Sequence, residues 1–519
     1  MRLNILIGGK AGQGINRVSH IVASILTKLG YFIFNYRDYQ SLIRGGHNFN
    51  VLSVSDKRVG SHESKIDGIV AHDDKTLEIH KSKLKKQGFV INYKGFEDER
   101  KNLNISLAGA LIKVLGIDKK ILVDEIAKQF DKKAVEAAEK GYESEKEKFS
   151  LKKLNNKIEI LSGSQAIAQG AINSGINLYL AYPMTPATGV LHELAGKQLE
   201  NKEKPFMVFQ PENEIAVANS ALGASFAGAK VMVGTSGGGF DLMTEALSFS
   251  GIAEIPLVVY LASRPGPGTG VPTYTTQGDL DIALRGGHGE FPRIVIAPGD
   301  PIECQEKVNE SFYLAEKFSV PVIILSDKHL AESEFSSNRE PNKILKIKVE
   351  RKVPGEAIVK ASSYEHDKFG NTTESAEITA RNAEARIEKY QEIKKETSKF
   401  QMIKIFGNPK AENLVIGWGS TKTAILDALD SIDNSISTGK GNYKFLQVLY
   451  MKPLSDEIKK EMQNAKNIIL VENNVTGQLG RLIREKTGTS ISKENRILKY
   501  DARPFKSDEL AKEIEGRVR

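Results

Sequence analysis

Short apolar runs alternate with amphipathic stretches along nearly the whole of this 519-residue chain, and no other feature constrains its fold as strongly. Short apolar runs bounded by turn residues are typical of buried strands, whereas the stretches between them have the helical period of about 3.6 residues. Strands that alternate with helices favour layered α/β domains with parallel sheets. A chain of this length exceeds what one hydrophobic core accommodates. The predicted fold class is therefore multidomain α/β.

The predicted elements fall into three groups. Residues 346–400 are polar and highly charged and are interpreted as a linker or insertion between the second and third groups. The resulting boundaries divide the chain into segments 1–155, 156–345, 346–400 and 401–519. In chain order, the predicted strands are 3–7, 31–35, 178–182, 206–209, 230–234, 257–262, 293–297, 320–325, 414–418, 445–449 and 467–472, and the predicted helices are 15–29, 164–174, 213–227, 240–251, 380–399, 421–429 and 508–513.

The net charge of +8 is concentrated in the first segment. Residues 1–155 hold 28 Lys and Arg against 19 Asp and Glu, whereas the rest of the chain holds 45 against 46. The lysines are mixed with acidic residues instead of forming a basic stripe, which argues against nucleic-acid binding. We interpret them as solvated faces, with an anionic protein or cofactor partner as the alternative.

Composition also bears on location and on metal binding. The longest apolar runs, such as 255–262, are far shorter than a membrane span, so no membrane association is predicted. The N-terminus leads directly into a predicted strand instead of a secretory signal. Cys304 is the only cysteine, which excludes an internal disulfide, a cysteine-based zinc site and an iron–sulfur cluster held by this chain alone. We therefore expect a cytoplasmic protein whose chain binds no metal.

Two glycine-rich turns each connect a predicted strand to a predicted helix. Gly8–Gly14 fits neither dinucleotide-binding nor P-loop spacing, because Arg17 occupies the last glycine position and Gly14 is not followed by Lys-Ser/Thr. Thr235–Phe240 has the same form. By themselves both are explained by tight turns whose glycines allow close backbone approach.

Three polar loops follow predicted strands of the second segment. They span 182–188, 210–214 and 263–270, and they carry a hydroxyl, a carboxyl and a guanidinium group respectively. In open parallel sheets, ligands bind in the crevice beyond the carboxyl ends of the strands. The spacing therefore predicts a site that handles a carboxylate, without naming it.

These loops also carry a family resemblance. Tyr-Pro-Met-Thr-Pro at 182–186, Glu-Asn-Glu-Ile-Ala at 212–216, Thr-Ser-Gly-Gly-Gly-Phe-Asp-Leu-Met at 235–243 and Arg-Pro-Gly-Pro-Gly-Thr-Gly-Val-Pro-Thr at 264–273 resemble the α subunit of 2-oxoacid:ferredoxin oxidoreductases. The glycine turn at 8–15 and Ser-Leu-Ile-Arg-Gly-Gly-His at 41–47 are similar to the γ domain of that family, fused in front. The resemblance thus implies a γ-type domain, a pyrimidine-binding parallel-sheet domain and a transketolase-C-terminal-like domain.

What the resemblance implies is one subunit of a thiamine diphosphate enzyme. Such an enzyme decarboxylates a 2-oxoacid oxidatively, forms an acyl-CoA with coenzyme A and CO2, and reduces ferredoxin. A β subunit would complete the thiamine site and supply Mg and the iron–sulfur cluster, so this chain would be active only in a heterodimer or a larger assembly. Among substrates, 2-oxoglutarate is favoured and pyruvate stays open.

Two other functions compete with this interpretation. One is a transketolase-type thiamine enzyme without electron transfer, which the γ-like first segment disfavours. The other is a non-catalytic α/β module that recruits a partner, which leaves the set of hydroxyl, carboxyl and guanidinium groups unexplained.

The resemblance assigns roles to two charged residues of the loops. Glu214 corresponds to the glutamate that contacts the aminopyrimidine ring of the cofactor, with Glu212 as the alternative if the register differs by two. Arg264 corresponds to the arginine that pairs with the substrate carboxylate, for which a planar guanidinium is suited. Without the neighbouring motifs, Glu214 would be better explained as a helix N-terminal acid. Arg264 would then be a surface arginine in a loop, which is the commoner case for arginines.

The remaining assignments are polar or ring-contacting residues. Thr185 and Thr273 correspond to hydroxyl groups that hydrogen-bond the substrate, although both also suit turns beside proline. Tyr182 and Pro183 are assigned to cofactor binding. His288 is a candidate for a supporting role near the crevice and is equally explained as a loop histidine.

Overall fold

The computed structural model describes the chain except residues 43–44, 201–204, 349–350, 353–354 and 519. It forms two compact units. The first combines Met1–Leu161 with two later segments, Ser333–Arg339 and Phe505–Lys512. The second combines Ser162–Glu332, Glu340–Pro504 and Glu513–Arg519.

The first unit is built on a mixed sheet with strand order β5–β4–β1–β3–β2–β13–β6. Strand β1 pairs antiparallel with β3 and parallel with β4. The outer strands β13 and β6 come from chain segments distant from the first five. The strands are β1 (Arg2–Ala11), β2 (Phe32–Asp38), β3 (Gly45–Ser55), β4 (Ile66–Ala71), β5 (Leu84–Asn92), β6 (Glu159–Ser162) and β13 (Glu334–Ser337).

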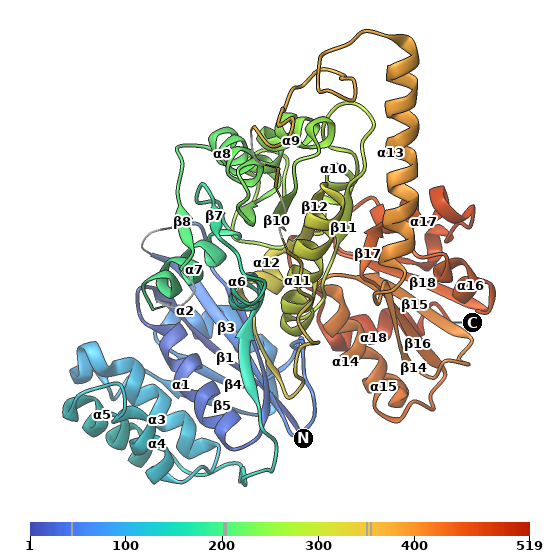
Figure 1. Ribbon diagram of the computed structural model, residues 1–519. Coiled ribbons are helices and arrows are strands. Elements are labelled where there is room, and N and C mark those ends of the chain that lie inside the picture. Colours follow the sequence, from blue (N-terminus) through green and yellow to red (C-terminus); the bar gives the residue numbers. More distant parts are fainter. Residues whose placement is uncertain (43–44, 201–204, 349–350, 353–354, 519) are drawn as a thin grey trace. The chain divides into compact units, whose positions relative to one another are not determined.

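Helices of the first unit cover this sheet and bury a core of aliphatic residues (Figure 1). Helix α1 presents its apolar stripe inward, with Val18, Val22 and Ile25 fully buried. The segments are α1 (Ile15–Lys28), α2 (Asp74–His80), η1 (Lys81–Lys83), η2 (Glu97–Asn102), α3 (Leu103–Val114), α4 (Lys119–Ile126), α5 (Lys132–Glu143) and the beginning of α18 (Ser507–Glu515).

The second unit contains a larger sheet with order β17–β11–β12–β10–β9–β7–β8. Its strands from β11 to β8 run parallel, and only β17 is antiparallel to its neighbour β11. The central strands β10 and β12 are buried along their entire length, as parallel strands covered on both faces are. The strands are β7 (Leu178–Leu180), β8 (Met207–Phe209), β9 (Val231–Thr235), β10 (Leu257–Ser263), β11 (Ile294–Ile296), β12 (Pro321–Asp327) and β17 (Tyr450–Lys452).

Helices around this sheet begin at polar caps that the sequence supplies. Ser162 and Gln165 form a reciprocal capping box at α6, and Asn213 and Asp300 accept backbone N–H groups at the starts of α8 and α11. The helices are α6 (Gly163–Asn173), α7 (Thr188–Glu200), α8 (Glu214–Phe226), α9 (Gly237–Ala253), α10 (Leu280–Arg285), α11 (Pro301–Phe318), α12 (Lys328–Glu332) and α13 (Ala376–Thr397).

A second sheet of this unit has order β14–β16–β15–β18–β19. One contiguous cluster of buried side chains includes Val259 of the larger sheet together with Trp418 and Leu446 of this one. The elements are β14 (Ile403–Gly407), β15 (Asn413–Trp418), α14 (Thr421–Asp433), α15 (Ser435–Thr438), β16 (Tyr443–Val448), α16 (Glu457–Gln463), β18 (Asn467–Glu472), α17 (Gln478–Thr487), η3 (Lys493–Asn495) and β19 (Arg496–Leu498).

The predicted fold class is confirmed, and the strands and helices predicted around the three loops of the second segment are present. The sequence pattern predicts no strand at 45–55, where β3 forms the antiparallel partner of β1. It likewise does not predict β13, which joins the first sheet from residues that follow the larger sheet in the chain. The four-segment division of the chain stays a prediction.

Candidate active site

The candidate site lies at the carboxyl edge of the larger sheet. Strands β10, β9, β7 and β8 are consecutive neighbours and run parallel, so the loops that follow them emerge at the same edge. Three of these loops are those singled out in the sequence, and the fourth is the glycine turn after β9. The sheet therefore brings together groups that lie tens of residues apart in the chain.

Glu214 is the first residue of α8 and is almost fully buried, with 3% of its surface exposed. Its Oε1 atom has no hydrogen-bond partner within the described chain. Glu212, two residues earlier, is exposed. A buried carboxyl oxygen without a partner costs free energy unless a ligand supplies the missing contact. The buried carboxyl group with a free oxygen at this edge is therefore that of Glu214 and not that of Glu212, and the contact with a cofactor ring stays a prediction.

The glycines after β9 make room for this carboxyl group. A Cβ atom at Gly239 would lie 2.6 Å from Oε1 of Glu214 and 2.1 Å from Oγ1 of Thr235, distances that real Cβ atoms essentially never show. A Cβ at Gly237 would likewise lie 2.6 Å from Oδ2 of Asp279. Both glycines have ordinary backbone angles, since neither has a positive φ. The turn is thus rich in glycine because acidic side chains pack against its backbone.

Arg264 follows β10 and connects two of the loops. Its Nη1 donates a hydrogen bond of 2.9 Å to the backbone carbonyl of Thr185 in the loop after β7. Its Nε is buried and has no partner within the described chain. Burial lowers the pKa of Arg264, and the nearby carboxyl groups of Asp279 and Glu214 oppose this shift. The guanidinium group is therefore fixed through its Nη1 atom and keeps its Nε–H available as a donor.

Asp279 is a further residue at this edge, and the sequence motifs assign no role to it. It precedes α10 and accepts no capping hydrogen bond there. Burial raises its pKa to about 6, Asp241 adds to the rise, and the Ser263 hydroxyl and Arg264 oppose it. The signal in the sequence is Gln-Gly-Asp-Leu at 277–280, which belongs to the same family resemblance but by itself also resembles an ordinary helix cap. The packing of Asp279 against Gly237 distinguishes it from a cap.

The other predicted residues surround this centre. Thr185 is half-buried and contributes its carbonyl group to Arg264. Tyr182 and Pro183 are exposed at the same edge of the sheet. Thr273 is buried farther along the loop after β10, in the stretch that leads to Thr275, whose hydroxyl donates to Asp327 at 3.0 Å.

His288 lies apart from this centre. It is exposed, and its backbone N–H donates to Oγ of Ser248 at 2.8 Å. Ser248 lies nine residues along α9 from Gly239, which at about 1.5 Å per residue corresponds to about 14 Å. The γ-like motif at 41–47 is in the first unit, and its Arg44 lies outside the described residues.

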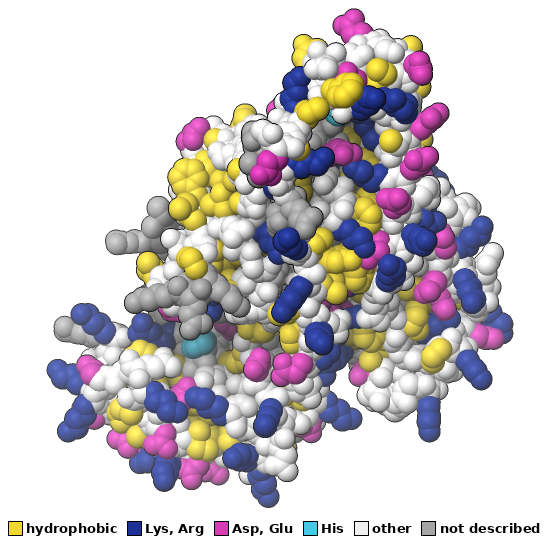
Figure 2. Space-filling model, viewed as in Figure 1, with side chains coloured by type: hydrophobic (Ala, Val, Ile, Leu, Met, Phe, Trp, Pro, Cys, Tyr) yellow, Lys and Arg dark blue, Asp and Glu magenta, His cyan; other side chains and the backbone are white. Residues whose placement is uncertain are grey.

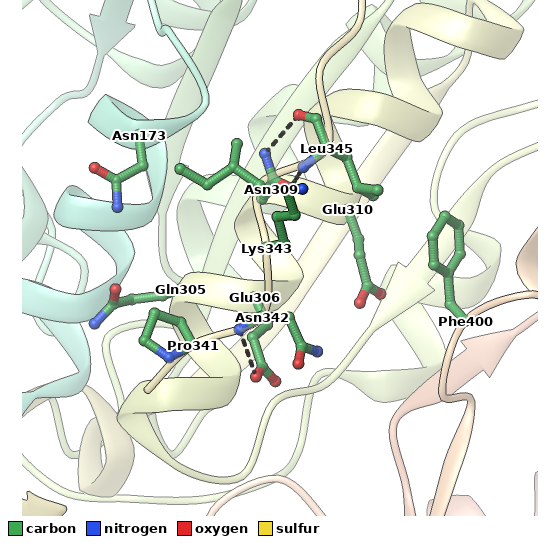
Figure 3. A pocket seen from close by; sticks show the side chains of 11 residues that line it. Asn173, Gln305, Glu306, Asn309, Glu310, Pro341, Asn342, Lys343, Leu345 and Phe400 are labelled. Carbon is green, nitrogen blue, oxygen red and sulfur yellow. Dashed lines mark hydrogen bonds between the residues drawn. The ribbon is translucent and has the colours of Figure 1, made fainter. Parts of the chain in front are cut away.

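A polar cavity of about 440 Å³ occurs elsewhere in the second unit (Figure 3). It lies where residues 341–345 pack along α11, and its polar groups are largely engaged in that packing. Asn309 exchanges hydrogen bonds of 3.2 and 2.7 Å with the backbone of Leu345, and Glu306 accepts one of 3.2 Å from the N–H of Asn342. We interpret this cavity as structural.

Comparison with known proteins first identifies the class of site. The family model described as pyruvate flavodoxin/ferredoxin oxidoreductase, thiamine diphosphate-binding, matches residues 169–401, which include all four loops. The model of pyruvate ferredoxin/flavodoxin oxidoreductase matches residues 4–102. The edge loops therefore belong to a thiamine diphosphate-binding α/β domain.

Relatives that match over nearly the full length identify the family. The 2-oxoacid:ferredoxin oxidoreductase subunit alpha of a Sulfolobus species is 30% identical over 98% of this chain and 96% of that protein. The 2-oxoglutarate synthase subunit KorA of Archaeoglobus fulgidus is 42% identical over 34% of this chain and 51% of that protein. A solved 2-oxoglutarate:ferredoxin oxidoreductase from Magnetococcus marinus is 25% identical with a TM-score of 0.88, covering all of both chains. The chain belongs to the 2-oxoacid:ferredoxin oxidoreductase α-subunit family.

Proposed function

We propose that this chain supplies the pyrimidine-side half of a composite site that decarboxylates a 2-oxoacid oxidatively, with coenzyme A as acyl acceptor and ferredoxin as electron acceptor. The observation that carries the proposal is Glu214, a buried carboxyl group with an unpartnered oxygen at the edge where four loops meet. Thiamine diphosphate, when bound, supplies the electron-accepting ring on which a 2-oxoacid loses CO2.

Within this site, Glu214 would hold a proton at the ring of the cofactor. The carboxyl group is shielded from water and fixed at the start of α8, next to the space that Gly239 leaves open. A carboxyl group that is fixed in place and has a free oxygen is suited to general acid–base work.

Arg264 would orient the substrate through its carboxylate. Its contact with the Thr185 carbonyl fixes the side chain, and the unpartnered Nε leaves a donor for a ligand oxygen. The nearby carboxyl of Asp279 limits the net positive charge at this point. Because decarboxylation must release the carboxylate, a moderated charge suits a contact that orients without trapping. The hydroxyl groups of Thr185 and Thr273 would donate hydrogen bonds to the same substrate. Tyr182 and Pro183 would contact the cofactor.

The partner would be a β subunit that provides Mg, the diphosphate site and the iron–sulfur cluster. One cysteine cannot ligate a cluster that needs four thiolates, so electrons must leave through another chain. Large hydrophobic side chains are exposed beside the site, and Figure 2 shows such side chains gathered over α8 and the β7–β8 edge. Exposed apolar patches of this kind mark protein–protein contacts. They include Tyr182, Met207, Phe209, Ile215, Leu242 and Val271.

The favoured substrate is 2-oxoglutarate. The solved relative from Magnetococcus marinus was determined with 2-oxoglutarate, coenzyme A and succinyl-CoA bound, and relatives are named 2-oxoglutarate synthase subunits. Pyruvate is the runner-up because both family models are named for pyruvate. A transketolase-type function without electron transfer is disfavoured, because the first segment matches an oxidoreductase model. We place the enzyme in the cytoplasm.

The proposal is tested with the chain co-produced with a β-type subunit. Under anaerobic conditions, the pair should reduce a viologen dye when given coenzyme A and 2-oxoglutarate, and more slowly with pyruvate. Glu214→Gln should lower turnover by about a hundredfold or more, because it removes the shared proton. Glu212→Gln, on the exposed neighbour, is the matched control and should leave turnover unchanged. Near-normal turnover of the Glu214 variant would refute the assignment.

A further inference from the structure

A second, smaller cavity of about 240 Å³ lies in the second unit and has no role in the proposed reaction. It is bordered by the end of α10, the turn after β17, α13 and α17, elements that lie side by side in Figure 1. Most of its charged lining groups are cations. The charged lining residues are Arg285, Lys394, Lys452, Asp456, Glu485 and Lys486.

The carboxylates of this cavity are already paired. Glu485 forms ion pairs with Arg285 and, at 3.0 Å, with Lys486. Asp456 pairs with Lys394 at 2.9 Å. Four cations thus line the cavity with two carboxylates, and three of the four, Arg285, Lys394 and Lys486, are already paired with them.

Lys452 is the cationic lining group that forms no ion pair with a carboxylate within the described chain. It is half-buried, and within the described chain its Nζ reaches only the backbone carbonyl of Leu284, at 3.5 Å. Burial first, and then the like charges of Arg293, Lys486 and Arg285, lower its pKa to about 8, while Glu485 opposes them. Holding an ammonium group among like charges is costly unless an anion compensates it.

Arg293, which does not line the cavity, adds to the positive potential at Lys452. Its side chain is 3% exposed and stacks on Phe291, with 4.3 Å between the guanidinium carbon and the ring centroid. Its Nη1 donates to the carbonyl of Gly286, whereas its Nε is buried and has no partner within the described chain. Two neighbouring cations are therefore incompletely compensated on the same side of the fold.

We propose that this cavity binds a doubly charged tetrahedral oxyanion, the phosphate group of free phosphate or of a small phosphate monoester. Lysine and arginine are the side chains that bind such groups, through a point charge and a planar fork respectively. The volume is below the range of about 300–1,000 Å³ that holds drug-sized ligands. The cavity thus accommodates the phosphate group itself, and any organic part would extend outward.

Titration calorimetry on the full chain tests the proposal with inorganic phosphate and ribose 5-phosphate as probes. Saturable binding of either supports it, and the tighter of the two identifies the source. Lys452→Met should weaken binding by about tenfold or more, because it removes a charge-assisted contact while keeping most of the side-chain volume. Lys459→Met on the exposed face of α16 is the matched control. Absence of binding by both probes, or equal binding by the Lys452 variant, would overturn the proposal.

A variant that is expected to bind phosphate more tightly controls for loss of binding through misfolding. Glu485→Gln frees Arg285 and Lys486 for the anion, so it should tighten phosphate binding several-fold. Phosphate should also raise the unfolding temperature of the wild-type chain and of the Glu485 variant, but not that of the Lys452 variant. Unchanged or weaker binding by the Glu485 variant would contradict the charge argument.

The pH dependence provides a separate test with sulfate, whose charge is constant across the range. Lys452 faces Arg285, Arg293, Lys486 and Glu485, besides the paired Lys394 and Asp456. The pKa of Glu485 is lowered chiefly by Lys486, so this carboxylate stays ionised at neutral pH and above. Sulfate binding should weaken as the pH rises above about 8, where Lys452 loses its proton. The Lys452→Met variant should not show this dependence, and a flat wild-type profile would count against the proposal.

Discussion

At the scale of single residues, Glu214 and Arg264 each keep one buried polar atom without a protein partner. Leaving such an atom unpaired costs about 1–3 kcal/mol. Most buried polar groups in folded proteins avoid this cost, so two such atoms on one edge of a sheet indicate a site prepared for a ligand. The adjacent Asp279, with a pKa raised to about 6 by burial, has the same character.

Substitution of Arg264 by lysine should separate charge from geometry. Lysine keeps the positive charge but loses the fork that can contact a carboxylate while remaining fixed to the Thr185 carbonyl. We expect the KM for the 2-oxoacid to rise by about tenfold or more, and the KM for coenzyme A to be unchanged. Steady-state kinetics of the two-subunit enzyme provide the measurement. Arg381→Lys, at an exposed position of α13, is the control. An unaltered 2-oxoacid dependence would remove Arg264 from substrate binding.

His72 in the first unit should make that unit sensitive to acid. Its Nδ1 lies 3.2 Å from the Gly8 carbonyl, and burial lowers its pKa from 6.5 to about 4. Below pH 6.5 the imidazole binds a proton in the unfolded chain but not in the folded chain. The free energy of unfolding therefore falls until the pH reaches about 4. A shift of this size corresponds to about 3 kcal/mol.

Urea unfolding of the first unit, followed by pulsed hydrogen exchange of β1 and β4 peptides, measures this loss. In His72→Gln the part of the acid sensitivity that comes from this imidazole should disappear, whereas His192→Gln, at an exposed position, should retain the wild-type profile. If the wild type and the His72 variant respond equally to pH, another group is responsible.

At the scale of elements, the loop after β10 is held by the second sheet of its own unit. The side chain of Gln277 donates to the carbonyl of Trp418 at 2.8 Å and accepts from the N–H of Asn473 at 2.9 Å. The N–H of Gln277 donates to the carbonyl of Asn473 at 2.7 Å. Residues at the ends of β15 and β18 thus fix the loop that begins with Arg264. The second sheet therefore supports the candidate site through this loop.

A buried ion cluster also connects α11, which packs beside the larger sheet, with elements of the second sheet. Glu303 of α11 is fully buried and lies 2.8 Å from Nζ of Lys404, 2.6 Å from Nζ of Lys422 and 2.7 Å from Nε2 of Gln447. The two ammonium groups outweigh the effect of burial and hold the pKa of Glu303 well below its usual range. The carboxylate is therefore ionised throughout the neutral pH range.

Glu303→Gln should destabilise the second unit by about 3–5 kcal/mol, because it leaves the buried ammonium group of Lys404 without a counter-charge and that of Lys422 with Asp300 alone. Trp418, the only tryptophan, is buried in this unit and reports unfolding by fluorescence. The urea midpoint should fall markedly for Glu303→Gln and stay unchanged for Glu290→Gln, which alters an exposed carboxylate. Equal midpoints would show that the cluster contributes specificity instead of stability.

At the scale of the whole molecule, we expect this chain to supply part of an active site that a second subunit completes. Its carboxyl edge holds a carboxyl group and a guanidinium, but within the described chain no cluster of His, Cys, Asp and Glu is suited to a metal ion. A search of the described helices likewise finds none with the length and hydropathy to cross a membrane.

We therefore expect the isolated chain to be inactive and to bind thiamine diphosphate weakly. Addition of the β-type subunit with Mg should raise cofactor affinity and start dye reduction together, because the diphosphate contacts arrive with the partner. Equilibrium dialysis and stopped-flow reduction measure the two effects. Replacing exposed Met207 and Phe209 of the edge strand β8 by serine should weaken assembly, and Leu199→Ser, at another exposed apolar position, is the control. Tight cofactor binding and turnover by the single chain would refute the composite site.

The sequence alone determined the fold class, the loops of the site and the residue types that they carry. These depend on local information: strand and helix periodicity, turn chemistry and motifs whose members are close in the chain. The family resemblance followed from the same motifs, and full-length relatives confirm it. The assignment of Glu214 and Arg264 to particular atoms of a ligand stays a prediction.

Tertiary structure decided the rest, because it depends on contacts between distant residues. Whether Glu212 or Glu214 is buried follows from how α8 packs at the sheet edge, and the role of Asp279 follows from its approach to Gly237. Strand β13 joins the first sheet through backbone hydrogen bonds, which carry little sequence signature. The excess of positive charge around Lys452 likewise arises only where four separate elements meet. A one-dimensional pattern records what each segment prefers, whereas burial and charge balance are properties of the packed chain.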